Sequence, residues 1–206
     1  SVFEFEGVLE HVQRRQATPG DDRVVGDEAP HFAAETEFVD AEFVEEVRFE
    51  SAGFGDPPAM RDVSFRDSVS FVDPTVDGGV IDLRDSVVPG GRLGQTVDGD
   101  VMYDLEGATL GDVKVEGGVG SPFEHCRFVH TTFDGFDFGK YRDSVATADW
   151  QIHTTLDSLD RPTPSRGDLE ATYLKAKNGA NDVGDDKAAG EFFRRELEYR
   201  RRGYRQ

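Results

Sequence analysis

The sequence has a single cysteine, Cys126, few lysines and no long apolar segment. One cysteine excludes an internal disulfide framework and is typical of a protein from a reducing compartment. No segment approaches the roughly 18 consecutive apolar residues that a membrane span needs, and no signal peptide is recognisable. We therefore expect a soluble, cytoplasmic chain. Because the first residue is Ser1 and not Met, we also expect a processed chain or a piece of a longer one.

Basic residues are scarce as well. There are 42 Asp and Glu residues against 23 Lys and Arg, which gives a formal net charge of −19, and only 5 of the basic residues are lysines. At molar salt the Debye length falls to about 3 Å, so a protein in concentrated salt tolerates such self-repulsion. Acidic, lysine-poor chains resemble those of extreme halophiles. An acidic surface aimed at a basic partner is the alternative, but the acids are spread along the whole chain, which favours halophilic adaptation.

What the chain does have is an apolar residue at every fifth position in several blocks. In residues 121–138 the spacing is carried by Phe123, Phe128, Phe133 and Phe138. A small or β-branched residue often stands two positions earlier, as Cys126 does before Phe128. A period of five fits neither an amphipathic helix nor a half-buried strand. We predict that the large residues of this period form an internal stack: Phe38, Phe43, Phe49, Phe54, Leu105, Leu110, Val115, Phe123, Phe128, Phe133 and Phe138.

The same pattern resembles the pentapeptide-repeat family over residues 32–145. The best single matches are AEFVE at residues 41–45 and ATLGD at residues 108–112. Some steps are six residues long, and the pattern breaks around residues 55–61. The resemblance implies an all-β solenoid, a right-handed quadrilateral β-helix with one repeat per side and four repeats per coil. About five or six coils would follow from the length of the repeat region.

We divide the chain into three parts. Residues 1–31 contain a segment, SVFEFEG, that is either an extra coil or a capping strand, followed by a Pro/Gly/Asp-rich loop at residues 16–30. Residues 32–150 form the predicted β-helix. Residues 151–206 contain a linker and two helices, the first starting at a capping box of Ser165 and Asp168 and the second covering residues 186–202. We expect these helices to form an antiparallel hairpin over the last coil. The apolar face of the first helix would contain Leu169, Tyr173, Ala176, Ala180 and Val183, and that of the second Ala189, Phe193 and Leu197.

Several patterns that could indicate a reactive or metal-binding site have simpler explanations. His125 and His130 hold equivalent outward positions in successive repeats, whereas Cys126 is at a small inward position, so they point apart and do not predict a zinc site. The Asp-Gly clusters at residues 77–79 and 98–100 are turn chemistry without the calcium-loop pattern. No phosphate loop or nucleophile elbow is present. We predict no catalytic, cofactor-binding or metal-binding residues and no enzymatic activity.

The C-terminal end carries the only basic segment of the chain. Its arginines are Arg194, Arg195, Arg200, Arg201, Arg202 and Arg205. They are either the solvated end of a helix, where cations interact favourably with the helix dipole, or a segment next to a membrane span on its cytoplasmic side. Residues 169–204 resemble the helical segment that follows pentapeptide repeats in haloarchaeal proteins, some of which continue into a two-helix, ion-channel-like membrane region. That resemblance implies attachment at the cytoplasmic face of a membrane beyond Gln206.

Three functions follow from these patterns. The first is a non-enzymatic scaffold or protein-interaction domain of a halophilic archaeon, which binds protein partners and makes no direct contact with nucleic acid. The second, implied by the resemblance, is a DNA mimic that binds DNA gyrase. The third is a polysaccharide-active β-helix, for which Trp150 is the one large stacking platform in the chain.

Overall fold

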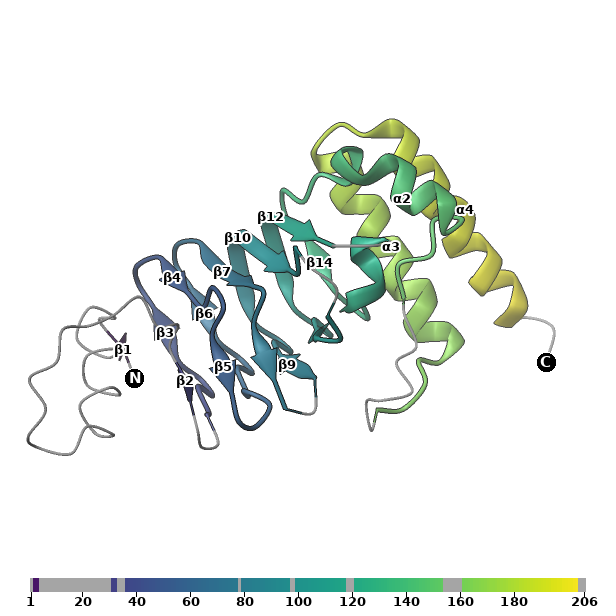
Figure 1. The fold of residues 1–206 in the computed structure, drawn as a ribbon. Coiled ribbons are helices and arrows are strands. Elements are labelled where there is room, and N and C mark those ends of the chain that lie inside the picture. Colours follow the sequence, from purple (N-terminus) through teal and green to yellow (C-terminus); the bar gives the residue numbers. More distant parts are fainter. Residues whose placement is uncertain are drawn as a thin grey trace, which may run out of the picture.

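The protein is a parallel β-solenoid of about four turns with helices at its C-terminal end (Figure 1). The computed structural model describes residues 2–3, 31–32, 36–77, 79–96, 99–117, 121–153 and 161–203. Strand β1 lies at one end of the rod and helix α4 at the other (Figure 1). The predicted loop at residues 16–30 lies outside the described residues. Val2 and Phe3 form strand β1, which pairs with β3, so this segment adds a strand to the first described turn.

Short parallel strands from successive turns form three sheets along the rod. In the largest, β1, β3, β6, β10, β12 and β14 follow one another, and β4 and β7 join it through β10. Its strands are Val2–Phe3 (β1), Glu42–Phe43 (β3), Val47–Arg48 (β4), Ser64–Phe65 (β6), Val69–Val72 (β7), Val87–Gly94 (β10), Thr109–Glu116 (β12) and Thr132–Phe133 (β14). The second sheet contains His31–Phe32 (β2), Gly53–Phe54 (β5) and Thr75–Val76 (β8). The third contains Val80–Asp82 (β9), Met102–Asp104 (β11) and Cys126–Arg127 (β13).

Each turn of the solenoid is longer than the five-residue period predicts. Four repeats of five residues would place about 20 residues in a turn. The observed register pairs Phe43 with Phe65 and Leu110 with Phe133, and both separations along the chain exceed that length. The extra residues lie in the longer steps, such as that from Phe43 to Phe49. The predicted number of five or six coils was therefore too high.

The interior consists of columns of large side chains, each one turn above the last. Aromatic rings stack within these columns: Phe43 on Phe65 with centroids 5.2 Å apart, and Phe49 on Phe71 at 4.6 Å. All the residues predicted to form the internal stack are buried except Phe38, which is partly buried against the core. The column that starts at Phe38 continues through Met60 and Leu83. The five-residue pattern did not include these two residues, because Met60 lies in the break at residues 55–61 and Leu83 follows it.

A second inward column holds the small residues. Ala41, Val63, Ser86, Ala108 and Thr131 occupy equivalent places in successive turns, and all are buried. The two hydroxyl groups are satisfied by the backbone: Ser86 donates to the carbonyl oxygen of Met60 at 2.6 Å, and Thr131 donates to that of Leu105 at 2.8 Å. A buried hydroxyl needs such a partner because leaving it unpaired costs stability.

One corner of the solenoid has the left-handed backbone conformation in every turn. The residues at this corner stand two positions after the column of Phe38, Met60, Leu83, Leu105 and Phe128, and their φ angles lie between 54° and 72°: Asp40, Asp62, Asp85, Gly107 and His130. Asp and Gly tolerate this conformation better than most residues. The three Asp residues are exposed, so the corner displays a line of carboxylates.

The later turns replace two short strands by one long strand. In an early turn, the inward residues Phe43 and Phe49 are six positions apart, and a bend separates β3 from β4. In a later turn, Val88 and Leu93 are five positions apart, and the single strand β10 contains both. Residues an odd number apart point to opposite faces of a regular strand, yet both are buried. Gly91 breaks the alternation with a φ of 115°, and a Cβ there would lie 2.0 Å from the carbonyl oxygen of Val69. Only glycine fits this position.

The solenoid ends earlier than predicted. The last strand among the described residues is β14. Residues up to 150 were predicted to belong to the β-helix, but within them Phe138–Tyr141 form the 3₁₀ helix η2 and Arg142–Thr147 form helix α2. Another 3₁₀ helix, η1, covers Pro122–His125. Phe138 is nevertheless buried, and its ring lies 4.7 Å from that of Phe192. We call residues 138–153 and 161–203 the cap.

The predicted helical hairpin is present as α3, Arg166–Asp182, and α4, Asp186–Gly203, which lie side by side (Figure 1). The capping box of Ser165 and Asp168 is confirmed. Helix α3 covers the last turn: a Cβ at Gly179 would lie 2.5 Å from the carbonyl oxygen of Phe133, so the helix approaches the backbone of β14 closely. No helix among the described residues is long and apolar enough to cross a membrane.

The predicted apolar face of α4 was partly wrong. Ala189 is buried, but Phe193 is exposed and Leu197 is only partly buried. The face that packs inward contains Ala188, Phe192, Arg195, Glu196 and Tyr199. On α3, Leu169, Tyr173, Ala176 and Ala180 are buried as predicted, whereas Val183 ends the helix and is exposed.

Candidate functional site

The arginines near the C-terminus are engaged within the cap. Arg194 pairs with Glu191 at 3.0 Å and with Asp149 at 2.9 Å. Arg195, almost fully buried, donates to the carbonyl oxygen of Asp149 and pairs with Glu198.

Arg200 pairs with Glu170 of α3 at 2.7 Å and with Glu196 at 2.5 Å. Arg201 is exposed, the side chain of Arg202 is outside the described part of the chain, and so is Arg205. Three of the six predicted basic residues, Arg194, Arg195 and Arg200, thus connect elements of the cap.

The structure describes Cys126 and the neighbouring histidines His125 and His130. Cys126 is fully buried, and burial raises the pKa of its thiol well above the ordinary value. His130 turns to the cap, where its Nε2 lies 2.9 Å from Oδ1 of Asp168. Hydrogen bonds from Ser165 and His130 hold the pKa of Asp168 at about 2. Within the described residues, no group of three or more His, Cys, Asp or Glu side chains is placed to hold a metal ion.

A cluster of buried ions crosses three turns on the outer face of the third sheet. Asp82, Asp104 and Arg127 are in register on successive strands, and Asp104 has no exposed surface. Arg127 donates to Asp104 at 3.1 Å, and Arg161, from the segment that leads into the hairpin, also donates to Asp104 at 3.1 Å. Arg84 binds Asp82 with two hydrogen bonds of 2.8 and 2.7 Å.

This cluster connects the solenoid to the segment that leads into the hairpin. Burial opposes ionisation of Asp82, but hydrogen bonds and charge from Arg84 outweigh it and lower its pKa. Asp82 therefore stays ionised beside the guanidinium groups. Asp104 is likewise bound by two guanidinium groups, those of Arg127 and Arg161.

A second polar cluster lies inside the cap, around His153. Nδ1 of His153 lies 2.7 Å from the Tyr173 hydroxyl, and Nε2 lies 3.3 Å from the Tyr199 hydroxyl. The two tyrosine rings stack with centroids 5.5 Å apart. Burial, and then the charge of Arg195, lower the pKa of His153, while burial raises the pKa of Tyr173. His153 is thus held neutral at the junction of α3, α4 and residues 150–153.

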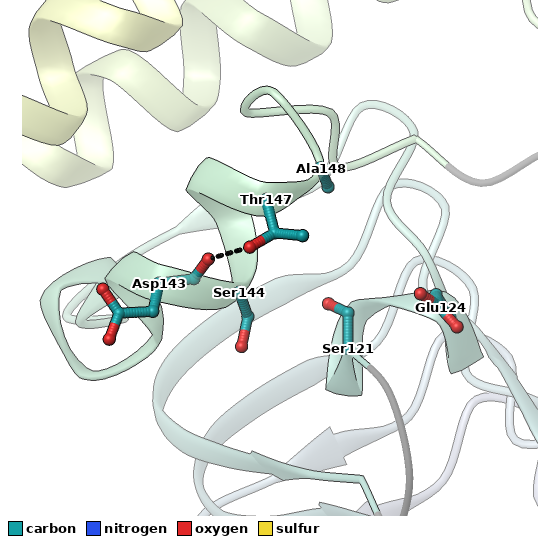
Figure 2. Close-up of a pocket in the computed structure, with 6 residues that line it drawn as sticks. All are labelled: Ser121, Glu124, Asp143, Ser144, Thr147 and Ala148. Atoms are coloured by element: carbon teal, nitrogen blue, oxygen red, sulfur yellow. Dashed lines mark hydrogen bonds between the residues drawn. The ribbon is translucent and has the colours of Figure 1, made fainter.

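A surface depression has a volume of about 440 Å³. It is lined by Ser121, Glu124, Asp143, Ser144, Thr147 and Ala148 (Figure 2). The Thr147 hydroxyl donates to the carbonyl oxygen of Asp143 at 2.8 Å. The carboxylate of Asp143 points away from Ser121 and Glu124 (Figure 2). The polar groups therefore do not converge on one point where a substrate atom could sit.

A smaller hollow of about 290 Å³ lies where the column of Phe32, Phe54 and Val76 ends. Gln95 lines it and is 5% exposed, and its Oε1 is buried without a hydrogen-bond partner. Gly99 lies directly over this amide, since a Cβ on Gly99 would be 2.3 Å from Oε1. The amide oxygen therefore lies against the backbone of Gly99, which also lines the hollow.

Trp150, the stacking platform expected for a polysaccharide-active protein, is buried. Its ring lies edge-on to that of Phe192 with centroids 5.4 Å apart. It packs the cap and cannot stack on a sugar.

The surface feature that sequence reasoning missed is the line of carboxylates at the left-handed corner. Asp40, Asp62 and Asp85 stand on consecutive turns, and neighbouring strands are about 4.8 Å apart. Glu45 and Asp67 form a second, shorter pair of exposed acids on consecutive turns. We call these five residues the acidic corners. In each case the acid stands two positions after an inward apolar residue, and this recurrence was the signal in the sequence that could have revealed them.

Comparison with known proteins gives no assignment: no protein-family model, curated protein or solved structure matches this chain significantly.

Proposed function

We propose that this chain is a non-enzymatic, protein-binding scaffold, built as a right-handed quadrilateral β-helix of the pentapeptide-repeat type. The regular register between successive turns and the alternating columns of large and small inward residues support that fold. The interior is filled by side chains, so the outer surface is what such a rod offers to other molecules. We place it in the cytoplasm of a halophilic archaeon on the strength of its charge of −19 and its single cysteine.

The observation that carries the proposal is the presence of the acidic corners. Asp40, Asp62 and Asp85 form a rigid line of negative charge with a spacing set by the solenoid backbone. A rigid array of like charges steers and orients a partner with complementary positive charge. The partner we expect is a protein with a basic groove or helix.

The three carboxylates at the left-handed corner can be removed without altering the backbone. Replacing Asp40, Asp62 and Asp85 together by Asn removes three charges, and Asn also adopts the left-handed conformation readily. The matched control replaces three exposed acids from other parts of the surface, Asp56, Asp134 and Asp182, by Asn. Both variants have the same net charge.

Tagged versions of the three proteins would be recovered from cells at native salt, and candidate partners would be purified and titrated against each. We expect a partner that binds wild type and control alike and that binds the corner variant at least about tenfold more weakly. Equal affinity for the two variants would refute the role of the corners.

The DNA-mimic function is favoured by the same line of charge. Its test is gyrase supercoiling at a salt concentration where both proteins are folded. Inhibition by wild type and not by the corner variant would identify gyrase as the partner, and unchanged supercoiling at stoichiometric excess would exclude it.

Membrane attachment beyond Gln206 is tested separately, by the intact mass of the native gene product and by its fractionation. A heavier product in the membrane pellet would support it, and a soluble product of this size would exclude it.

A further inference from the structure

Phe193 differs from the other described phenylalanines in its exposure to solvent. Of the phenylalanine side chains that the structure describes, the others are buried or partly buried, whereas Phe193 is 44% exposed. It lies on the outer side of α4, directly after the buried Phe192. A large exposed aromatic side chain is a common anchor of protein interfaces.

Phe193 belongs to an apolar stripe along the seam between α3 and α4. The ammonium group of Lys177 lies 5.2 Å from the centre of the Phe193 ring, which fixes these two residues at the same level of the hairpin. Leu174 precedes Lys177 by three residues and Leu197 follows Phe193 by four, so both lie one turn further along on the same side of the antiparallel pair. Leu174 is exposed and Leu197 is partly buried. We call Leu174, Phe193 and Leu197 the apolar stripe.

Most of the charged side chains next to the stripe are paired within the hairpin, and Arg201, four residues after Leu197, is exposed. Lys177 binds Glu196 at 2.8 Å, and Arg200 binds Glu170 and Glu196. This face is therefore close to neutral in a protein whose net charge is −19. Two copies that approach through their solenoids bring their acidic surfaces together. Two copies that approach through this face keep those surfaces further apart, so the like-charge repulsion between them is weaker.

We propose that the apolar stripe is the contact between two copies of this chain, which pack hairpin against hairpin about a two-fold axis. In a two-fold contact, the same surface of each copy faces the other, so that surface must be complementary to itself. An apolar face whose charges are largely balanced meets this requirement. A helix of this length is about 26 Å long, and two adjacent helices are about 20 Å wide, so the face offers roughly 500 Å² per copy. That area is small for a stable complex and corresponds to a weak, reversible dimer. The inference does not depend on the proposed scaffold function.

The test is sedimentation velocity of the full chain over a range of protein and salt concentrations. We expect a monomer–dimer equilibrium that shifts toward the dimer as salt rises, because salt screens the repulsion between the two acidic rods. A contact between the basic side of one hairpin and the acidic solenoid of another copy would show the opposite, since salt weakens attraction between unlike charges. Dissociation on adding salt therefore overturns the proposal.

Two variants with the same change of charge sharpen the test. Phe193→Glu places a carboxylate in the centre of the stripe, and Val44→Glu places one at a solenoid position that is 45% exposed. We expect Phe193→Glu to weaken dimerisation at least about tenfold and Val44→Glu to leave it within about twofold. Circular dichroism and the unfolding midpoint of the dilute monomer show whether each variant is folded. A wild-type monomer at all concentrations, or a dimer that Phe193→Glu does not weaken, overturns the proposal.

Discussion

The solenoid and the cap are held together in different ways. In the solenoid, the same few contacts recur in every turn: a large residue stacks on a large one, a small residue on a small one, and an Asp, Gly or His takes the left-handed corner. In the cap, each contact occurs once, as between His153 and the two tyrosines or between Arg195 and Asp149. A contact that recurs leaves a period in the sequence, whereas a contact that occurs once leaves no such trace.

The largest effect should come from breaking a column of the solenoid. Replacing Phe128 by Ala removes a fully buried ring that lies 5.7 Å from Phe123 and 5.7 Å from Phe133. We expect a loss of about 3 to 5 kcal/mol in the free energy of unfolding, measured by denaturant titration. Phe38 stands at the other end of the same column and is partly buried, so Phe38→Ala should cost clearly less. An unchanged midpoint for Phe128→Ala would mean that this column does not carry the fold.

The next effect tests the ionic connection between solenoid and cap. Asp104→Asn removes the charge that the buried Arg127 and Arg161 share. We expect a loss of about 2 to 3 kcal/mol, because guanidinium groups remain buried without their full complement of negative charge. Asp112→Asn breaks the exposed pair with Lys140 and should cost less than about 1 kcal/mol. Equal costs for the two variants would show that burial of the cluster is unimportant.

Lowering the pH should have a smaller effect on stability, and this effect should be confined to the cap. Because the pKa of His153 is lowered in the folded protein, the unfolded chain binds a proton more readily below the ordinary value of 6.5. The stability that the folded protein gains from neutral His153 is therefore complete above about pH 6.5. It is lost as the pH falls below that value. Trp150, the single tryptophan, packs against Phe192 and reports on the cap by its fluorescence.

His153→Gln should make the fluorescence-detected midpoint less sensitive to pH between 6.5 and 5. The groups that face His153 are Tyr173, Tyr199 and Arg195, and none of them changes charge in this range. An identical pH dependence in wild type and variant would assign the effect to another group.

The smallest effect should appear at the left-handed corner. Asp62 stands between Asp40 and Asp85, with one turn of about 4.8 Å to each side. Asp62→Asn keeps the backbone preference and removes the like-charge repulsion, so we expect a gain of about 0.3 to 0.5 kcal/mol at low salt. The gain should vanish at molar salt, where the Debye length is about 3 Å. Urea unfolding of both proteins at the two salt concentrations measures this, and a gain that persists at high salt would exclude a charge effect.

Much of the solenoid could be predicted because its signal is repeated. The spacing of Phe123, Phe128 and Phe133 identified buried residues individually, and the small position correctly placed Cys126 inside. The five-residue period predicted too short a turn. It was measured within runs of regularly spaced apolar residues, whereas the longer distances between inward residues occur between those runs. The need for glycine at positions 91 and 111 could not be predicted from the sequence. These residues lie close to the backbone of Val69 and Pro89 in the previous turn, and that contact exists only in the folded structure.

The cap was predictable only at its local features. The capping box at Ser165 and the break at Gly184 define the ends of the helices from neighbouring residues alone. The buried face of α4 was not predictable, because Phe192 and Phe193 are adjacent and equally apolar. Docking against Phe138 and Trp150 selected Phe192. Helix α2 was missed because the predicted repeat was extended across residues 142–147.

The sequence by itself determined most of the inward residues of the solenoid, the start of α3 and the break between α3 and α4, and the strong negative charge of the whole chain. These properties depend on residues within a few positions of one another or on composition. Only the tertiary structure decided that Asp40, Asp62 and Asp85 form one line, that Arg195 and Arg200 bind Asp149 and Glu170, and that Phe193 remains outside. The partners in these contacts lie far apart along the chain, and only the stacking of turns and the docking of the cap bring them together.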